Sequence, residues 1–246
     1  MTAPHPRLES RRALHFDPPA NMLRPTPALA ILLISTALIS RAQPIQGGGL
    51  FGRVSNGAYI SPTGAFQVPI PVRPETGGTI TDTANVVTFQ DDYDILDIIA
   101  AFPMDPSQKW ELSIKTKAEY LQGFFSQYVL PDFRRAFPKV EVESTGTFIP
   151  SLCDGALVVY TLLPGGSLFA SKVPTIDPNR KPPVAKRGNM LFVRNGFIFV
   201  VSNELAERAT EGSAFTLTQT EEDVLLRERL TDLVAKIHFQ SPPAAR

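Results

Sequence analysis

The segment Met190–Val201, MLFVRNGFIFVV, decides the fold. Two apolar runs, Met190–Val193 and Phe197–Val201, are joined by Arg194 and the pair Asn195-Gly196. Asn-Gly is a residue pair that accepts the positive φ angles of a type I′ turn, which connects adjacent antiparallel strands. The segment therefore predicts a β-hairpin.

Other apolar runs predict further strands before this hairpin. They are rich in β-branched and aromatic residues, and turn-forming residues lie between them. The predicted strands are Ala58–Ile60, Phe66–Val68, Asn85–Phe89, Ile95–Phe102, Val140–Ile149, Gly155–Leu163 and Ser167–Val173. The Pro-rich stretch Asp177–Asn189 predicts a loop that leads into the hairpin.

A mid-chain helix is predicted to begin at Thr116. Thr116 and Glu119 have the spacing of a capping box, in which each side chain pairs with an otherwise unpaired backbone N–H. Apolar residues then recur at helical spacing as far as Tyr128. Pro131 is expected to interrupt this helix. The assignment of Trp110–Ile114 stays open, because the apolar residues there alternate as in a strand.

A second helix is predicted near the C-terminus, with Thr220 as its N-cap. Acidic residues follow Thr220 directly and complement the positive end of the helix dipole. The helix carries one apolar stripe, formed by Leu226, Leu230, Leu233, Val234 and Ile237.

This order of elements resembles the PsbP/Mog1-like family. Three segments carry the resemblance: Tyr59–Val68, Val87–Asp92, and the Asn195-Gly196 hairpin with the helix that follows and Ile237–Phe239. The resemblance implies an α+β fold, an α/β/α sandwich. Its antiparallel β-sheet of about six to eight strands would carry one mid-chain helix and one C-terminal amphipathic helix. It also implies a non-catalytic binding or assembly role, often at membranes.

The apolar run Ala28–Ile39 predicts a signal peptide. It follows Met22-Leu23-Arg24 and ends at Ser40-Arg41-Ala42, which supplies the positive start and the small residues that export requires. Cleavage after Ala42 would leave an extracytoplasmic protein, periplasmic or secreted. The alternative is a protein anchored in the membrane by uncleaved residues 28–39, although the run is shorter than the roughly 20 apolar residues that span a bilayer.

The chain thus divides into three predicted regions. Residues 1–42 form an N-terminal extension and signal peptide, with Met22 as an alternative start. Residues 43–57 are Gly-rich and form a flexible linker. Residues 58–241 form a single α+β domain, which the length of the chain allows.

Few side chains suited to catalysis remain in the predicted mature chain. His5 and His15 precede the cleavage point, so His238 is its only histidine, and Cys153 is its only cysteine. One residue of each kind cannot form a closed zinc site, and a Ser-His-Asp triad would have to use His238. We expect Cys153 to be a buried structural thiol and His238 to be a partly buried packing residue.

An acidic cluster after the strand Asn85–Phe89 is the best candidate site. Asp92, Asp94 and Asp97 could supply oxygen ligands to Ca²⁺, and no other cofactor is expected. Together with Asp91 they could instead supply an acid/base pair for glycoside cleavage. The alternative is a solvated connecting turn, because Asp hydrogen-bonds its own backbone there.

Basic residues in the predicted loop form a second candidate site. Arg180, Lys181, Lys186 and Arg187 are expected to contact an anionic membrane surface or an acidic protein partner, unless they only form a solvated loop. The chain has 24 Lys and Arg residues and 24 Asp and Glu residues. It therefore lacks the basic excess of a nucleic-acid-binding protein.

The scarcity of catalytic side chains favours an exported, non-catalytic binding or assembly module of a bacterial-type cell envelope over an enzyme. Two alternatives stay open. One is a carboxylate-based hydrolase or Ca²⁺-binding protein that acts on envelope glycans. The other is a protein tethered by residues 28–39.

Overall fold

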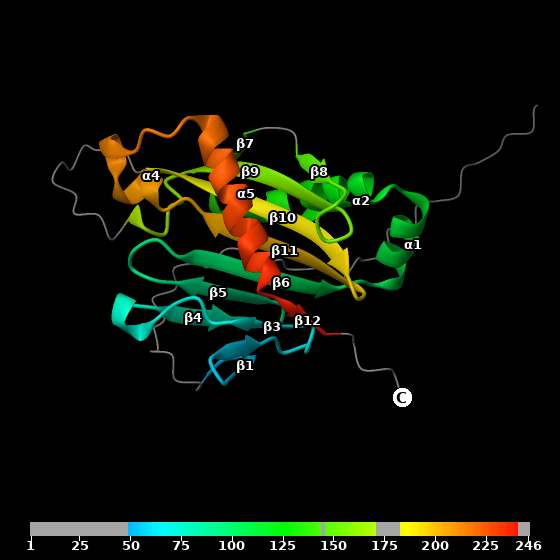
Figure 1. Cartoon of the computed structure of the whole chain (residues 1–246). Coiled ribbons are helices and arrows are strands. Elements are labelled where there is room, and N and C mark those ends of the chain that lie inside the picture. The colour runs from blue at the N-terminus through cyan, green and yellow to red at the C-terminus, as the bar shows by residue number, and fades with distance from the viewer. Residues whose placement is uncertain (1–48, 144–145, 171–182, 241–246) are drawn as a thin grey trace, which may run out of the picture. The chain divides into compact units, whose positions relative to one another are not determined.

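A computed structural model of the chain describes residues 49–143, 146–170 and 183–240, and Figure 1 shows their arrangement. The predicted signal peptide, the start of the predicted linker, and Arg180 and Lys181 lie outside the described residues.

An antiparallel sheet of eight strands forms the centre of the fold. Its order is β4-β5-β6-β11-β10-β9-β7, and β8 also pairs with β9 (Figure 1). The strands are β4 (Thr79–Asp82), β5 (Val86–Gln90), β6 (Leu96–Pro103), β7 (Glu141–Val142), β8 (Thr147–Ile149), β9 (Ala156–Pro164), β10 (Val184–Arg194) and β11 (Phe197–Glu204). The predicted antiparallel sheet is confirmed.

The predicted hairpin lies in the middle of this sheet, as β10 and β11. Asn195 and Gly196 both have positive φ angles, 50° and 77°, and Arg194 pairs with Phe197. β9 flanks β10 and β6 flanks β11, so both hairpin strands are buried on both edges. The rings of Phe192 and Phe199 stack across the two strands at 5.2 Å, which anchors the aromatic core.

A smaller sheet of four strands has the order β1-β2-β3-β12. Its strands are β1 (Arg53–Ser55), β2 (Ala58–Ile60), β3 (Phe66–Pro69) and β12 (His238–Phe239). Strand β1 lies in the range predicted to be a flexible linker. It is ordered because its backbone pairs with β2 along its whole length.

The carboxylate of Asp82, at the end of β4, ties the two sheets together. It accepts the backbone N–H groups of Phe51 and Gly52 at 3.0 and 2.7 Å, and the hydroxyl of Tyr59 at 2.7 Å. The residues that precede β1 are therefore held against the large sheet.

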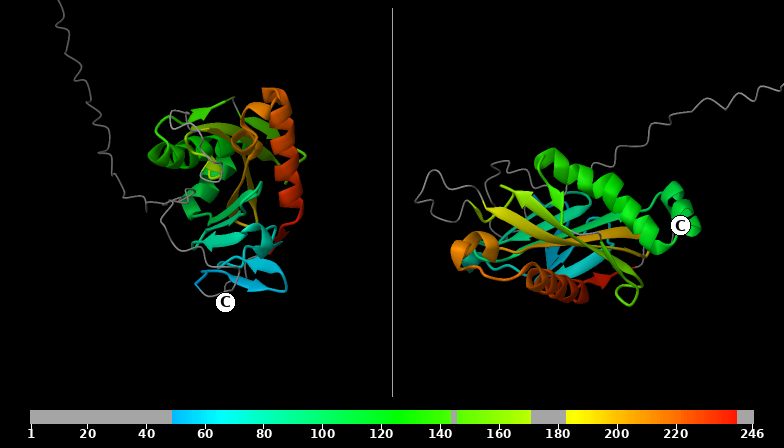
Figure 2. Two further views of the ribbon diagram at one scale, coloured as in Figure 1. Left: turned by 90° about the vertical axis from the view of Figure 1, so that its left-hand side faces the viewer. Right: turned by 90° about the horizontal axis from the view of Figure 1, so that it is seen from above.

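Helices cover both faces of the large sheet (Figure 2). One face carries α1 (Pro106–Ile114), α2 (Lys117–Phe124) and α3 (Leu130–Ala136), and the other carries α5 (Gln219–Ala235). The short α4 (Glu207–Thr210) follows β11, and single 3₁₀ turns occur at Pro74–Thr76 and Gly212–Ala214. The predicted α/β/α sandwich is confirmed.

The mid-chain helix begins as predicted but does not stop at Pro131. The Thr116–Glu119 capping box is present. A π-helical segment, Phe125–Val129, follows α2 and leads directly into α3. A proline lacks the N–H that an α-helix requires, so the wider turn that precedes Pro131 allows the helix to continue through it.

The stretch with alternating apolar residues is helical and forms most of α1. Asp105 and Gln108 make a complete capping box at its start, and Pro106 occupies the first turn. The alternation arises because Trp110 and Ile114 point to solvent rather than to the core.

Helix α5 begins two residues earlier than predicted, at a capping box made by Thr218 and Glu221. Its buried stripe includes Leu226 and Leu230. A glycine at position 188 of β10 allows this close contact, because a Cβ there would lie 2.9 Å from Cδ1 of Leu230.

One strand prediction and one loop prediction near the hairpin were wrong. The described part of the predicted strand Ser167–Val173, Ser167–Ala170, forms turns, and residues 171–173 lie outside the described residues. The strand that pairs with β9 is β10, which begins at Val184, inside the predicted loop Asp177–Asn189. Tertiary contacts, described below, account for this difference.

Candidate functional site

The acidic segment is organised by Asp91. One oxygen of its carboxylate accepts the backbone N–H groups of Tyr93, Asp94 and Ile95, at 3.0, 3.0 and 2.9 Å. This arrangement closes the turn between β5 and β6 in the way that Asp residues commonly do.

The structure does not bring the three predicted metal ligands together. Asp92 and Asp94 are exposed on the turn, whereas Asp97 is buried in β6 and accepts a hydrogen bond of 2.8 Å from Asn203 of β11. Within the described parts of the chain, no group of three or more His, Cys, Asp or Glu side chains is placed to hold a metal ion.

Asp97 should limit stability at neutral pH. Burial raises the pKa of its carboxyl, and the hydrogen bond from Asn203 offsets only part of that rise. Because the folded pKa is above the unfolded value, the carboxyl stabilises the fold at low pH, and this contribution is lost as pH rises through the folded pKa.

Asp97→Asn is neutral at every pH and should raise the melting temperature at about pH 7, with little change at about pH 3. Thermal unfolding followed by circular dichroism checks this. The exposed Asp94→Asn serves as the control and should leave the melting temperature unchanged at both pH values. A lower melting temperature for Asp97→Asn at pH 7 would contradict the pKa argument.

Lys186 and Arg187, predicted to contact an anionic surface, lie inside β10 and are buried. Their side chains point to opposite faces of the sheet, as neighbouring residues of a strand must. Both are fully engaged with carboxylates of the same chain, so neither is accessible to a membrane or partner. The expectation is corrected for these two residues.

Three carboxylates surround the ammonium group of Lys186. The distances are 2.5 Å to Glu143, 2.9 Å to Glu222 and 2.6 Å to Asp223. Burial alone lowers the pKa of Lys186, but hydrogen bonds to these carboxylates outweigh it and raise the pKa overall. The cluster joins β10 to α5 and to the segment after β7.

On the other face of the sheet, Arg187 pairs with Glu204 of β11. Its Nη2 and Nε lie 3.0 and 3.1 Å from the same carboxylate oxygen, and Nη2 also donates to the carbonyl of Gly166. Both side chains of this pair are buried, so they neutralise each other in the interior and do not form a site.

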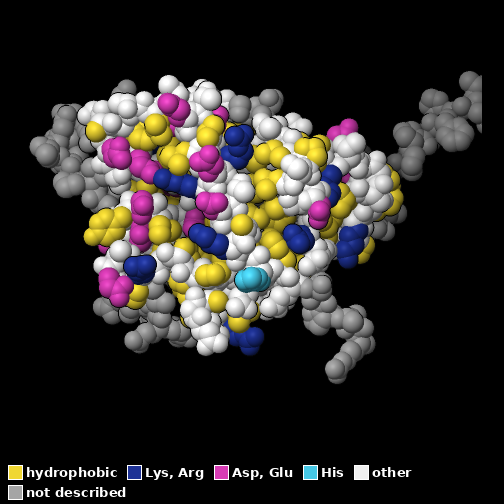
Figure 3. All heavy atoms as spheres, viewed as in Figure 1, with side chains coloured by type: hydrophobic (Ala, Val, Ile, Leu, Met, Phe, Trp, Pro, Cys, Tyr) yellow, Lys and Arg dark blue, Asp and Glu magenta, His cyan; other side chains and the backbone are white. Residues whose placement is uncertain are grey.

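A groove of about 430 Å³ lies at the C-terminal end of α5. It lies among α5, the loop between β8 and β9, the end of β10, and β12. Its lining residues are Leu152, Cys153, Arg194, Thr231, Val234, Ala235, Ile237, His238 and Phe239. Figure 3 shows hydrophobic side chains gathered on this face, beside the single described histidine. This open groove combines apolar and polar side chains and is the candidate ligand site of the described residues.

Arg194 and Phe239 define one side of the groove. The guanidinium of Arg194 lies 4.7 Å from the centre of the Phe239 ring. That ring meets the core rings of Phe192 and Phe199 edge-on, at 5.6 and 5.0 Å. The cation therefore rests on a ring fixed by the core, while remaining exposed to solvent.

Cys153 also lines the groove and is half-buried, whereas it was expected to be a buried structural thiol. Burial raises the pKa of this thiol, and the nearby Arg194 offsets only part of the rise. Cys153 and Asp154 both have left-handed backbone angles, φ 53° and 59°, which are uncommon for residues other than Gly. The side chain of Lys117 donates to the Asp154 carbonyl and holds this loop against α2.

His238 is exposed, although it was predicted to be a partly buried packing residue. It is the first residue of the two-residue strand β12, where it pairs with Gln67 of β3. Alternation along this strand turns Phe239 toward the core, and so His238 points outward to the rim of the groove.

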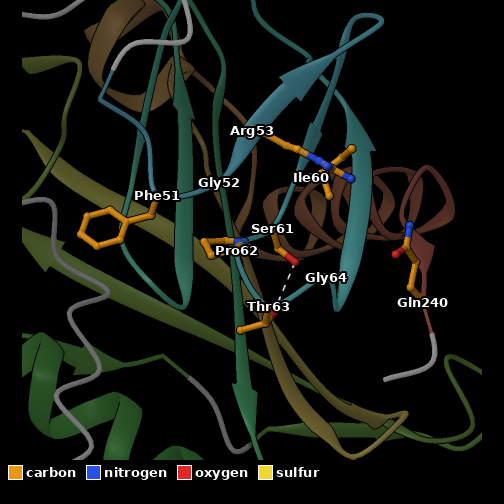
Figure 4. A pocket seen from close by; sticks show the side chains of 9 residues that line it. All are labelled: Phe51, Gly52, Arg53, Ile60, Ser61, Pro62, Thr63, Gly64 and Gln240. Carbon is orange, nitrogen blue, oxygen red and sulfur yellow. Dashed lines mark hydrogen bonds between the residues drawn. The ribbon is translucent and has the colours of Figure 1, made fainter. Parts of the chain in front are cut away.

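A second hollow, of about 600 Å³, lies beside the turn Ser61–Gly64 of the small sheet (Figure 4). The Ser61 hydroxyl is used within the turn, where it accepts the N–H of Phe66 and lies 3.5 Å from the Thr63 hydroxyl. Figure 4 shows Phe51 pointing away from Arg53 and Gln240. The polar groups do not converge, so this hollow is the weaker candidate.

Comparison with known proteins gives similarity only at the level of the fold. No protein-family model matches the sequence, and no curated protein matches it. The solution structure of cyanobacterial PsbP (CyanoP) from Synechocystis sp. PCC 6803 is similar, with 11% identity, 80% of this chain and 100% of that chain covered, and a TM-score of 0.43. The crystal structure of the Saccharomyces cerevisiae Ran-binding protein Mog1p has 14% identity, 77% and 97% coverage, and a TM-score of 0.42.

A crystal structure from Bacteroides thetaiotaomicron VPI-5482 is also similar, with 10% identity over 76% of this chain and a TM-score of 0.34; the match spans half of that longer chain. The predicted PsbP/Mog1-like resemblance is confirmed. With TM-scores below 0.5, no partner or activity follows from it.

No helix within residues 49–143, 146–170 and 183–240 combines the length and the hydrophobicity that a membrane-spanning helix requires.

Proposed function

We propose that this protein is an exported, non-catalytic binding module that holds an apolar group ending in an anion in the groove at the end of α5. The observation that carries the proposal is the exposed guanidinium of Arg194, which rests on Phe239 above apolar walls. An apolar ligand segment would displace water from the half-buried Leu152 and Phe239, and an acidic end would pair with Arg194.

The chemistry of the groove supports binding rather than catalysis. A cysteine acts as a nucleophile only as the thiolate, and burial keeps the Cys153 thiol protonated at neutral pH. The acidic residues considered for hydrolysis are in a turn and in a buried strand, not in the groove. The export part of the proposal is supported by the apolar run Ala28–Ile39 and its flanking residues.

Octanoate is a suitable probe, because it combines a short apolar chain with a carboxylate. Arg194→Gln should weaken octanoate binding about tenfold, since a charged hydrogen bond is lost. Calorimetry measures the affinity, and chemical-shift changes at Thr231 and Phe239 locate the ligand.

The protein should be recovered from the extracytoplasmic fraction, where an N-terminal residue of Gln43 would support the export step.

Two controls make this result specific. Arg227→Gln, an exposed substitution elsewhere on α5, should leave octanoate affinity unchanged. 1-Octanol, which lacks the charge, should bind the parent and Arg194→Gln equally. Octanoate affinity that is unaffected by Arg194→Gln, or shifts confined to other parts of the protein, would count against the groove.

A further inference from the structure

Helix α1 carries an apolar face that the core does not use. Trp110 is 65% exposed and Ile114 is 60% exposed. They are four residues apart and therefore share one face of the helix. The other side of α1 faces inward, where Gln108 is buried and Leu112 is half-buried. Two large apolar side chains thus stand together in solvent, beyond any need of the fold.

The layer formed by α1, α2 and α3 is basic. Residues 106–139 include Lys109, Lys115, Lys117, Arg134, Arg135 and Lys139, against the acidic Glu111, Glu119 and Asp132. Each acidic side chain is already engaged within the layer. Glu111 pairs with Lys115, Glu119 caps α2 at Thr116, and Asp132 pairs with Arg135.

Positive charge therefore remains on this layer, at exposed Lys109, Arg134 and Lys139. Figure 3 shows Lys and Arg side chains among hydrophobic ones at the α1 end of the molecule, together with some Asp and Glu, which are more densely gathered over α4 and α5. Lys109 directly precedes Trp110 and is exposed on an adjacent side of α1, so positive charge borders the apolar face.

We propose that Trp110 and Ile114 insert into the headgroup region of an anionic membrane, with Lys109 bound to a lipid phosphate and the other exposed cations of the layer adding attraction. Trp favours the boundary between hydrocarbon and water, because its ring is apolar and its N–H is polar. Basic residues near the surface add attraction to anionic lipids. This contact uses different side chains from the groove and goes beyond the ligand binding proposed for it.

Trp110 is the only tryptophan in the chain, so its fluorescence reports on the proposed contact alone. The full chain is mixed with vesicles of phosphatidylglycerol and phosphatidylcholine, and with vesicles of phosphatidylcholine only. With the anionic vesicles, Trp110 emission should shift to shorter wavelengths, and added salt should reverse the shift. The neutral vesicles should give a much smaller shift.

Matched variants separate this contact from binding by any other segment. Lys109→Gln should weaken binding to anionic vesicles about fivefold, as expected for one surface charge. Ile114→Ser should also weaken it, because apolar area is lost. The exposed residues Lys236 and Leu217 provide the controls, and neither Lys236→Gln nor Leu217→Ser should change vesicle affinity.

Three outcomes would overturn the proposal. The first is no shift of Trp110 emission with anionic vesicles, and the second is an equal shift with neutral ones. The third is a shift caused by a polyglutamate peptide but not by vesicles, which would assign the surface to an acidic protein partner.

Discussion

Replacing Lys186 by Met should lower the free energy of unfolding by about 3–5 kcal/mol, because it removes one partner from a buried ionic cluster. Lys186 is 0% exposed and lies within 3 Å of three carboxylates. Without the ammonium group, Glu143, Glu222 and Asp223 would repel one another, and among the described residues Arg208 would remain as the cation beside Glu222, at 3.3 Å. Urea unfolding followed by circular dichroism measures the loss.

The pH dependence of this loss has a definite direction. The folded pKa of Lys186 lies above its ordinary value of 10.5, so its stabilising contribution is complete below that pH and disappears as pH rises through the folded pKa. The difference between the parent and Lys186→Met should therefore shrink in strongly alkaline solution. The exposed Lys109→Met is the control and should cost less than about 0.5 kcal/mol. A similarly small loss for Lys186→Met would contradict the prediction.

Arg187→Met should destabilise the protein by a similar amount, about 3–5 kcal/mol, because it leaves Glu204 charged and buried. Glu204 is 0% exposed, and its Oε1 has no hydrogen-bond partner among the described residues. Its negative charge is therefore balanced by Arg187 through Oε2 alone. Urea unfolding again measures the loss.

The double variant Arg187→Met with Glu204→Leu tests whether the charge itself is responsible. Apolar residues often replace a buried ion pair without loss of stability, so the double variant should recover most of what Arg187→Met loses. A double variant less stable than Arg187→Met would show that the pair is needed for packing or for its bond to Gly166.

Those parts of the fold that depend on neighbouring residues could be predicted from the sequence. The β10–β11 hairpin follows from Asn195-Gly196, and the start of α2 follows from Thr116 and Glu119. The signal for α1 was also present, as Asp105 and Gln108. Exposed Trp110 and Ile114 hid it, since periodicity locates a helix only when its apolar residues face the core.

The burial of residues whose partners are distant in the sequence could not be predicted. Lys186 and Arg187 resemble loop residues, and their carboxylate partners Glu222 and Glu204 are 36 and 17 residues away. Without knowledge of those partners, charge predicts exposure. The start of β10 was missed for this reason, and the two residues were wrongly assigned to a surface.

The groove was missed for a related reason. It combines Cys153, Arg194, Thr231 and His238, which come from four separate segments. The local sequence accounts for each of these residues separately. Cys153 lies in a turn, Arg194 in the hairpin, Thr231 in a helix and His238 in a short strand. Only the packing of α5 and β12 against the hairpin brings them together.

The opposite charge of the two helical layers gives the sandwich an electric dipole moment. Against the basic layer of α1–α3, residues 207–236 carry Glu207, Glu211, Glu221, Glu222, Asp223, Glu228 and Asp232, and only Arg208, Arg227, Arg229 and Lys236. Near a negatively charged surface the resulting torque turns the molecule before any contact is made. Collisions are thus biased toward the face that bears Trp110, and the encounter rate falls as ionic strength rises.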